Sequence, residues 1–206
     1  MGPGRMGREL WSQTGFTLVE LLIALAISSV LLASMMGFYL GQQRAYALRE
    51  QVSEMQQNVR SGLALLTREI RMAGYNPTGM AGVGIAAAGP QTIRLTMDLN
   101  SDGDTDDANE DVTYSLYDSG SDGDLDLGRK SGGGQNVPVA ENIVRLQFVY
   151  TLSDGSATTT PANPGEIRRV HVALTAHTAR PDPAYVINHG YRLAMLTSHI
   201  TPRNLQ

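Results

Sequence analysis

The feature that most constrains this chain is an apolar run near its N-terminus. Residues Phe16 to Leu40 are 25 consecutive positions in which Glu20 carries the only charge. As an α-helix the run would be about 37 Å long, which is enough to cross the hydrocarbon core of a bilayer with some tilt. A carboxylate near the centre of a bilayer costs roughly 2.5–3.5 kcal/mol on insertion scales, so Glu20 needs a partner.

The residues before this apolar run predict its orientation in a membrane. Two simpler interpretations of the run also stay open. Arg5 and Arg8 precede it, and basic residues stay on the cytoplasmic side of a membrane, so the residues after the run are expected outside. A secretory signal peptide cleaved near Ala33-Ser34 is one alternative, although its apolar region should be only about 7–15 residues long. A plain membrane anchor is the other, and it accounts for the length but not for Glu20.

The start of the run resembles a processing signal. Gly15-Phe16-Thr17-Leu18-Val19-Glu20-Leu21 is similar to the class III signal sequence of type IV pilins and type II secretion pseudopilins. This resemblance implies that a prepilin peptidase cuts between Gly15 and Phe16 and methylates the new amine of Phe16. It also implies that Glu20 pairs with the N-terminal amine of a neighbouring subunit. Such pairing would relieve the cost of an unpartnered carboxylate in hydrocarbon.

A polar segment with a regular apolar stripe follows the run. Its apolar residues recur three or four positions apart, as one face of an amphipathic helix requires. They are Ala45, Leu48, Val52, Met55, Val59, Leu63, Leu66, Ile70 and Ala73. Because no proline occurs between Pro3 and Pro77, residues 16–73 are predicted to form one nearly continuous helix that Gly74 ends. The stripe is predicted to pack on the protein's own sheet, with a coiled coil as the alternative.

The rest of the chain is predicted to be rich in β-structure. Residues 75–91 are rich in glycine and are predicted to form a loop. Strands are predicted at Thr92–Met97, Val112–Tyr117, Ile143–Leu152 and Ile167–Thr178, with a C-terminal pair near Ala184–Ile187 and Tyr191–Ser198. A long helix followed by strands and short turns predicts an α+β fold, in which the helix packs on a C-terminal antiparallel β-sheet head. The pilin resemblance implies the same fold.

The predicted organisation therefore has four parts. Residues 1–15 form a cleaved leader, residues 16–40 a transmembrane and filament-core helix, residues 41–74 an amphipathic helix that packs on the head, and residues 75–206 the β-rich head. The resemblance places the chain in the inner membrane as a single-pass protein. Its N-terminus is expected in the cytoplasm and its head outside, followed by a place in the pilus at the cell surface.

An acidic segment of the head, DLNSDGDTDDANED at residues 98–111, is the strongest candidate for binding chemistry. Against the EF-hand calcium loop, Gly103 falls at the turn and oxygen-bearing side chains fall at the ligand positions. The predicted Ca²⁺ ligands are Asp98, Asn100, Asp102, Asp104 and Asp106. Asn109 stands where the template has a bidentate Glu, and Glu110 comes one residue later, so a weak site is expected. The alternative is a solvated acidic turn.

A second acidic stretch, DSGSDGDLD at residues 118–126, fits the template less well. Gly120 offers no side-chain ligand, and Arg129 occupies the last ligand position. We therefore predict a hairpin turn between two strands rather than a second metal site.

Composition and spacing exclude several other functions. The chain has no cysteine, which excludes disulfides, a thiol nucleophile and cysteine-based metal sites. Its net charge is −4 and it has no basic patch, so nucleic acid is not an expected partner. The four histidines show no metal-ligand spacing, and no nucleophile–base constellation can be traced. We therefore do not expect an enzyme.

Three further stretches narrow the resemblance. EMQQNVRSGLALLTREIRMAGYNPTG, VTYSLYDSGSDGDLDLGR and the ending TPRNL resemble PilW-type minor pilins, relatives of the secretion pseudopilin J. The resemblance implies a non-catalytic subunit that helps to initiate type IV pilus assembly at or near the tip, with other major and minor pilins as partners. Two alternatives stay open. One is a minor pseudopilin of a type II secretion system, and the other is a membrane-anchored, calcium-dependent binding module.

Overall fold

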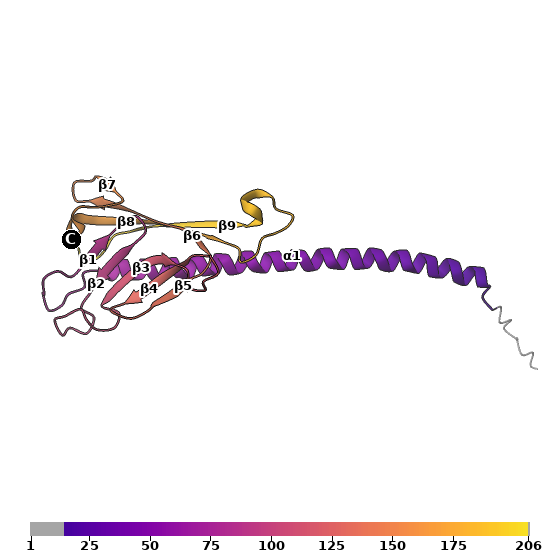
Figure 1. Ribbon diagram of the computed structural model, residues 1–206, viewed down its shortest axis with the longest axis horizontal. Helices are drawn as coiled ribbons and strands as arrows, with labels where there is room; N and C mark the ends of the chain where they lie inside the picture. The colour runs from indigo at the N-terminus through magenta and orange to yellow at the C-terminus, as the bar shows by residue number, and fades with distance from the viewer. Residues whose placement is uncertain (1–14, 206) are drawn as a thin grey trace, which may run out of the picture. The chain divides into compact units, whose positions relative to one another are not determined.

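The computed structural model describes residues 15–205. The chain divides into two compact units, residues 1–47 (the N-terminal unit) and residues 48–206 (the C-terminal unit). Helix α1, Leu18–Met72, is 55 residues long and passes from the first unit into the second (Figure 1). It confirms the predicted helix to within two residues at its start and one at its end, and it continues through Gly37 and Gly41.

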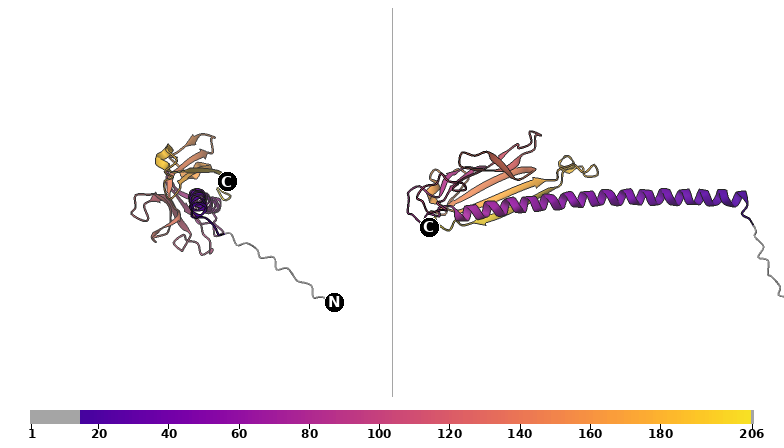
Figure 2. Two further views of the ribbon diagram at one scale, coloured as in Figure 1. Left: turned by 90° about the vertical axis from the view of Figure 1, so that its right-hand side faces the viewer. Right: turned by 90° about the horizontal axis from the view of Figure 1, so that it is seen from below.

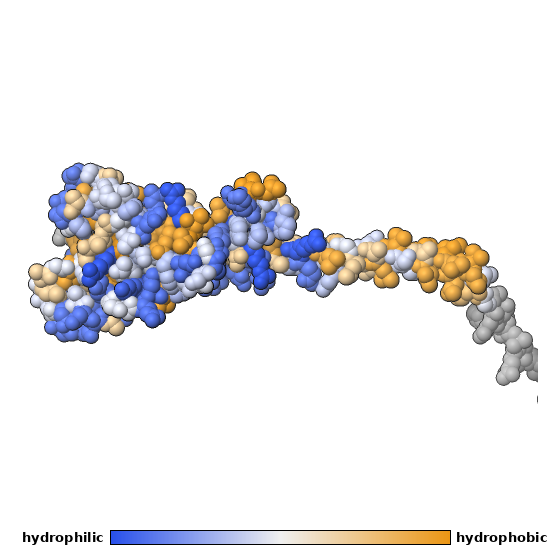
Figure 3. Space-filling model, viewed as in Figure 1, coloured by the Kyte–Doolittle hydropathy of each residue, from blue (hydrophilic) through white to orange (hydrophobic). Residues whose placement is uncertain are grey.

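In the N-terminal unit, α1 presents apolar side chains to its surroundings. One stretch of the helix is long and apolar enough to cross a membrane, with a mean hydropathy of 2.3 over 18 residues, and none of these described residues is buried. Figure 3 shows this concentration of apolar side chains along the N-terminal part of α1. A helix that is apolar all round is stable only when a membrane or other protein covers it.

The C-terminal unit contains the amphipathic part of α1 and two antiparallel sheets, which stand beside that part of the helix (Figure 2). The first sheet has the order β1-β2-β3-β4-β5 and the second β7-β6-β8-β9. The strands of the first sheet are β1 Ile85–Ala88, β2 Ile93–Thr96, β3 Asp111–Tyr117, β4 Asp126–Ser131 and β5 Asn136–Ala140. Those of the second are β6 Ile143–Leu152, β7 Ala157–Thr158, β8 Ile167–His177 and β9 Leu193–Ile200. Two short 3₁₀ turns, η1 Pro164–Glu166 and η2 Ile187–Gly190, complete the unit.

The apolar stripe of α1 packs into the core of the C-terminal unit, as predicted. Met55, Val59, Leu63, Leu66, Ile70 and Ala73 are buried together with inward-facing residues of both sheets. Burying each large apolar side chain contributes about 1.5–3 kcal/mol, so this stripe holds helix and sheets together. The helix lies close to β5 at Gly62, where an added Cβ would lie 2.7 Å from the Cβ of Ala140.

The observed strands confirm most of the predicted ones and correct two segments. β2, β3, β6 and β8 coincide with predicted strands to within about a residue at each end, and β9 overlaps the last one. The strand predicted at Ala184–Ile187 is wrong, because Ala184 lies in a turn, the next two residues belong to no helix or strand, and η2 begins at Ile187. Within η2, Asn188 and His189 have positive φ angles. The loop predicted at 75–91 contains β1.

Candidate functional site

The predicted processing site lies just before α1. Gly15, Phe16 and Thr17 belong to no helix or strand, and the Phe16 side chain is 89% exposed. Apart from Gly15 itself and its chain neighbours, no described residue has an atom within 4 Å of the position that a Cβ would take on Gly15. The peptide bond between Gly15 and Phe16 is therefore accessible. The rest of the predicted leader, residues 1–14, lies outside the described residues.

Glu20 takes part in the first turn of α1. Its Oε2 accepts hydrogen bonds from the backbone N–H of Thr17 at 2.8 Å and from the Thr17 hydroxyl at 2.9 Å. The Thr17 Oγ1 in turn accepts from the N–H of Glu20 at 3.2 Å. This reciprocal pattern is a capping box, which satisfies N–H groups that a helix start leaves without partners. The Thr-x-x-Glu spacing at residues 17–20 is the sequence signal for this motif.

In the acidic segment, the side chains of Asp98 and Asn100 hold the loop through hydrogen bonds. Asp98 is fully buried, and its carboxylate accepts from the Thr78 hydroxyl at 2.6 Å and from the Ser101 N–H at 2.7 Å. The side-chain amide of Asn100 donates to Asp102 at 2.8 Å and to Asp107 at 2.7 Å. Both residues thus hold the loop in one conformation.

Four acidic side chains of this loop converge on one point. Asp102, Asp104, Asp107 and Glu110 each direct a carboxylate oxygen to it, and these oxygens all lie within 4.8 Å of one another. Two of the four were among the predicted ligands, whereas Asp107 and Glu110 were not. The predicted ligands Asp98 and Asp106 do not belong to this group of carboxylates, and the side-chain amide of Asn100 donates to two of its members, Asp102 and Asp107.

The proximity of these carboxylates perturbs their protonation. Partial desolvation and the negative charges of Asp102 and Glu110 raise the pKa of Asp107. A hydrogen bond shared with Asp106 raises the pKa of Asp104. The amide of Asn100 has the opposite effect on Asp102, because its hydrogen bond stabilises the ionised form and lowers the pKa. The loop therefore concentrates negative charge that its own hydrogen bonds offset only in part.

The second acidic stretch forms the turn between β3 and β4, and the antiparallel pairing of these strands confirms the predicted hairpin. The Asp118 carboxylate accepts from the N–H groups of Asp122 and Gly123 at 3.3 and 3.1 Å. Asp126 is buried and accepts from the N–H of Asn142 at 3.0 Å. These carboxylates serve the backbone of the turn.

A buried polar network connects the acidic loop to α1. Glu69 on α1 lies 3.0 Å from the Arg129 guanidinium on β4 and accepts a 2.7 Å hydrogen bond from the Tyr114 hydroxyl on β3. Arg129 also donates to the side-chain oxygen of Asn109 at 2.9 Å. Burial and the charge of Glu69 raise the pKa of Tyr114, which stays protonated and acts as a donor. Sequence reasoning missed this network, because its members lie 45 and 60 positions from Glu69 along the chain.

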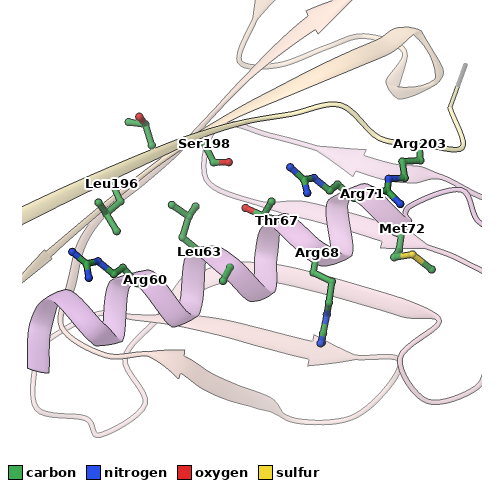
Figure 4. A pocket seen from close by; sticks show the side chains of 11 residues that line it. Arg60, Leu63, Thr67, Arg68, Arg71, Met72, Leu196, Ser198 and Arg203 are labelled. Atoms are coloured by element: carbon green, nitrogen blue, oxygen red, sulfur yellow. The ribbon is translucent and has the colours of Figure 1, made fainter.

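A groove lies between α1 and β9 in the C-terminal unit (Figure 4). Its volume is about 510 Å³, and Leu63 and Leu196 contribute apolar side chains to its lining. The arginines that line it are Arg60, Arg68, Arg71 and Arg203. The groove shares no residue with the acidic loop, so it is a separate, basic surface of this unit.

Comparison with known proteins adds one finding on the N-terminal unit. Residues 12–36 match the family model described as the prokaryotic N-terminal methylation motif, and this range contains Gly15, Phe16 and Glu20. Residues 12–14 of the match lie outside the described residues.

A search of solved structures and a search of curated proteins gave different results. Among solved structures, the chain is similar to a type IV-like pilin from Thermus thermophilus, with 14% identity and a TM-score of 0.44. That similarity covers 77% of this chain and 98% of the other. The comparison with curated proteins found no match.

The family motif and the observed architecture agree on one conclusion. The motif coincides with the exposed start of α1 and with the carboxylate of its first turn, and the same helix packs on antiparallel sheets further along. Residues 12–36 of this chain carry the prokaryotic N-terminal methylation motif, at the start of an apolar helix whose later part packs on antiparallel sheets.

Proposed function

We propose that this chain is a PilW-type minor pilin, a non-catalytic subunit that acts in the assembly or initiation of a type IV pilus at or near its tip. The observation that carries the proposal is the methylation motif at the start of an apolar helix that is exposed over its described length in the N-terminal unit. A subunit of this kind needs membrane before assembly and neighbouring helices after it, because an apolar helix is unstable in water.

The proposal includes the partners and the location of the chain. A prepilin peptidase would remove residues 1–15, and residues 16–40 would span the inner membrane with the C-terminal unit outside. Other major and minor pilins would then cover the apolar helix in the filament. The Glu20 carboxylate would pair with the N-terminal amine of a neighbour.

Processing can be tested on the full chain, produced together with a prepilin peptidase in a bacterium that assembles type IV pili. We expect mass spectrometry of the mature protein to show the loss of residues 1–15 and a methyl group on Phe16. Gly15→Val is the matched control. It places a branched side chain immediately before the bond to be cut, and we expect it to leave the precursor intact. A mature protein that begins near Met35 would instead show cleavage as a secretory signal peptide.

The role in the pilus needs a separate measurement, because a minor pseudopilin would be processed in the same way. We expect deletion of the gene in its own host to reduce the number of surface pili, and re-expression of the unaltered chain to restore it. The Gly15→Val variant should fail to restore it. A deletion strain with normal pili and defective protein secretion would assign the chain to a type II secretion system.

A further inference from the structure

We propose that the loop at residues 98–111 binds one Ca²⁺ ion through Asp102, Asp104, Asp107 and Glu110. This ligand set differs from the one that the EF-hand template predicts, because it includes Asp107 and Glu110 in place of Asp98, Asn100 and Asp106. The proposal concerns the C-terminal unit alone and does not depend on the proposed role in a pilus.

The spacing of the four carboxylates matches the size of a calcium coordination sphere. Ca²⁺ binds oxygen ligands at about 2.3–2.6 Å, so two ligands on opposite sides of the ion lie about 4.6–5.2 Å apart. The four oxygens lie within 4.8 Å of one another. They can therefore contact one ion without a large movement of the backbone.

The burial of Glu110 is a second observation, independent of the spacing of the carboxylates, that points to a bound cation. Its side chain is almost completely buried, with 1% of the residue exposed, and Oε1 accepts from the N–H groups of Leu99 and Asn100 at 2.7 and 3.2 Å. The other oxygen, Oε2, is buried and has no hydrogen-bond partner among the described residues. A buried carboxylate oxygen without a partner is costly, and a bound cation would remove that cost.

Sheet pairing explains why Glu110 points inward. The N–H of Met97 donates to the carbonyl of Glu110 at 2.9 Å, so the β2–β3 ladder continues one residue beyond the strands. Side chains two positions apart on a strand share a face, which places Glu110 on the buried side with Val112 and Tyr114. The sheet therefore sets the direction of this side chain, and the N–H groups of Leu99 and Asn100 hold its carboxylate.

The remaining members of the loop fit the same site. Gly103 has a φ of +89°, a conformation that a residue with a side chain rarely adopts, and it lets Asp102 and Asp104 face the same point. Two other acidic residues of the segment already have partners elsewhere. Asp98 accepts from Thr78, and Asp111 forms an ion pair with Arg94.

The chemistry of the ligands selects the ion. All four side chains offer oxygen ligands. Zinc and copper prefer nitrogen and sulfur ligands, so this set favours a hard cation instead. Three of the four ligands are exposed and lie on an irregular loop. Ca²⁺ accepts six to eight oxygens in irregular arrangements, whereas Mg²⁺ requires a nearly ideal octahedron. Backbone carbonyls and water would complete the coordination of Ca²⁺.

Calorimetric titration of the full chain in detergent micelles with CaCl₂, after removal of metals by a chelating resin, tests the proposal. We expect one ion per chain with a Kd of about 10⁻⁴–10⁻³ M, at the weak end for calcium loops, because three ligands are exposed. Mg²⁺ at equal concentration should leave the isotherm nearly unchanged. The absence of binding at millimolar Ca²⁺ would overturn the proposal, and equal binding of Mg²⁺ would overturn the choice of ion.

Two neighbouring aspartates give a matched pair of variants. Asp107→Asn and Asp106→Asn remove the same charge from adjacent positions, but only Asp107 belongs to the converging group. We expect Asp107→Asn to weaken Ca²⁺ binding on the order of tenfold or more, because the affinity of such loops follows the number of charged ligands, and Asp106→Asn to have a much smaller effect. An equal or larger loss for Asp106→Asn would support the EF-hand ligand set and contradict ours.

Glu110→Gln tests the buried ligand. Its side-chain oxygen can still accept from Leu99 and Asn100, while the charge is lost. We expect this variant to lose Ca²⁺ binding and to unfold at the same temperature in CaCl₂ and in EDTA. Unaltered chain should unfold at a higher temperature in CaCl₂, because an ion that binds only the folded state stabilises it. Normal Ca²⁺ binding by Glu110→Gln would show that Glu110 is not a ligand. If this variant does not fold, the comparison of Asp107→Asn with Asp106→Asn still tests the ligand set.

Discussion

Two histidines that are far apart in the sequence stack on each other in the second sheet. His171 on β8 pairs with His199 on β9, and their ring centroids are 4.2 Å apart. Partial burial of His171, together with the charge that His199 carries when protonated, lowers the pKa of His171. An interaction of this kind arises from the register of two strands, and the spacing of the histidines in the sequence does not reveal it.

This pair should make stability depend on pH. Because the folded state lowers the pKa of His171, the unfolded chain binds more protons as the pH falls through and below the ordinary histidine value of about 6.5. The free energy of unfolding should therefore fall as the pH is lowered through this range. We expect thermal unfolding of the full chain in micelles, followed by circular dichroism, to show a smaller decrease for His199→Gln than for the unaltered chain. His189→Gln, outside the pair, is the control, and an equal change in both variants would contradict the assignment.

At the scale of elements, the C-terminal residues close the end of α1. The backbone N–H of Arg203 donates to the carbonyl of Arg71 at 3.1 Å, and the side-chain amide of Asn204 donates to that of Met72 at 3.2 Å. The last carbonyls of a helix have no partner within the helix. Arg203 satisfies that of Arg71, and Asn204 adds a second donor to that of Met72, which also accepts from the N–H of Tyr75 at 2.9 Å. Gly74 follows with a φ of +79°, and an added Cβ there would meet Leu205 at 2.6 Å.

The contribution of this closure can be measured with Asn204→Ala. The variant removes the side-chain donor to the helix end, and we expect it to lower the free energy of unfolding by about 1 kcal/mol, the usual value for one hydrogen bond. Arg203→Ala is the control, since it keeps the backbone donor. Chemical denaturation of the full chain in micelles measures both. A larger effect for Arg203→Ala would show that the arginine side chain, rather than the amide of Asn204, stabilises this end.

At the scale of the whole molecule, the two units are suited to different surroundings. The described part of the N-terminal unit exposes large apolar side chains and carries Glu20, whereas the C-terminal unit buries its apolar residues in a core of helix and sheets. A carboxylate opposes insertion into hydrocarbon, so an interaction formed after insertion must offset the cost of burying Glu20. Pairing with a neighbouring subunit would provide that benefit.

Glu20→Ala separates these two effects. The substitution removes a charge from the apolar run, so we expect membrane fractionation to show insertion that is unchanged or greater. Incorporation into surface filaments, counted by immunolabelling, should fall. Glu50→Ala, which removes the same carboxylate from an exposed position further along α1, should leave both unchanged. If Glu20→Ala subunits enter filaments at the normal level, charge pairing is not required for this subunit.

Much of the first sheet could not be predicted from local patterns. β5 contains Pro138, which is tolerated because β5 is an edge strand. β4 combines Gly128 with Arg129 and Lys130, residues that weaken a strand signal, and pairing on both sides holds it in place. The apolar residues at 184–187 favour a strand by local pattern, but the positive φ angles of Asn188 and His189 turn the chain there, and no sequence periodicity reveals those angles.

The sequence by itself determined the features that depend on neighbours within a few residues. The bounds of α1, its apolar N-terminal part, its buried stripe and its end before Gly74 all follow from a periodicity of 3.6 residues and from local helix signals. Strands β2, β3, β6 and β8 follow from a periodicity of two.

Only the tertiary structure decided which polar groups meet. The sequence placed seven acidic residues in the segment 98–111, but the bonds of Asp98 to Thr78 and the continued pairing of Met97 with Glu110 determine which carboxylates converge. In the same way, Glu69 finds Arg129 and Tyr114 only because α1 lies against β3 and β4. Hydrogen bonds and ion pairs act over a few ångströms in space, and the fold, rather than the spacing along the chain, sets those distances.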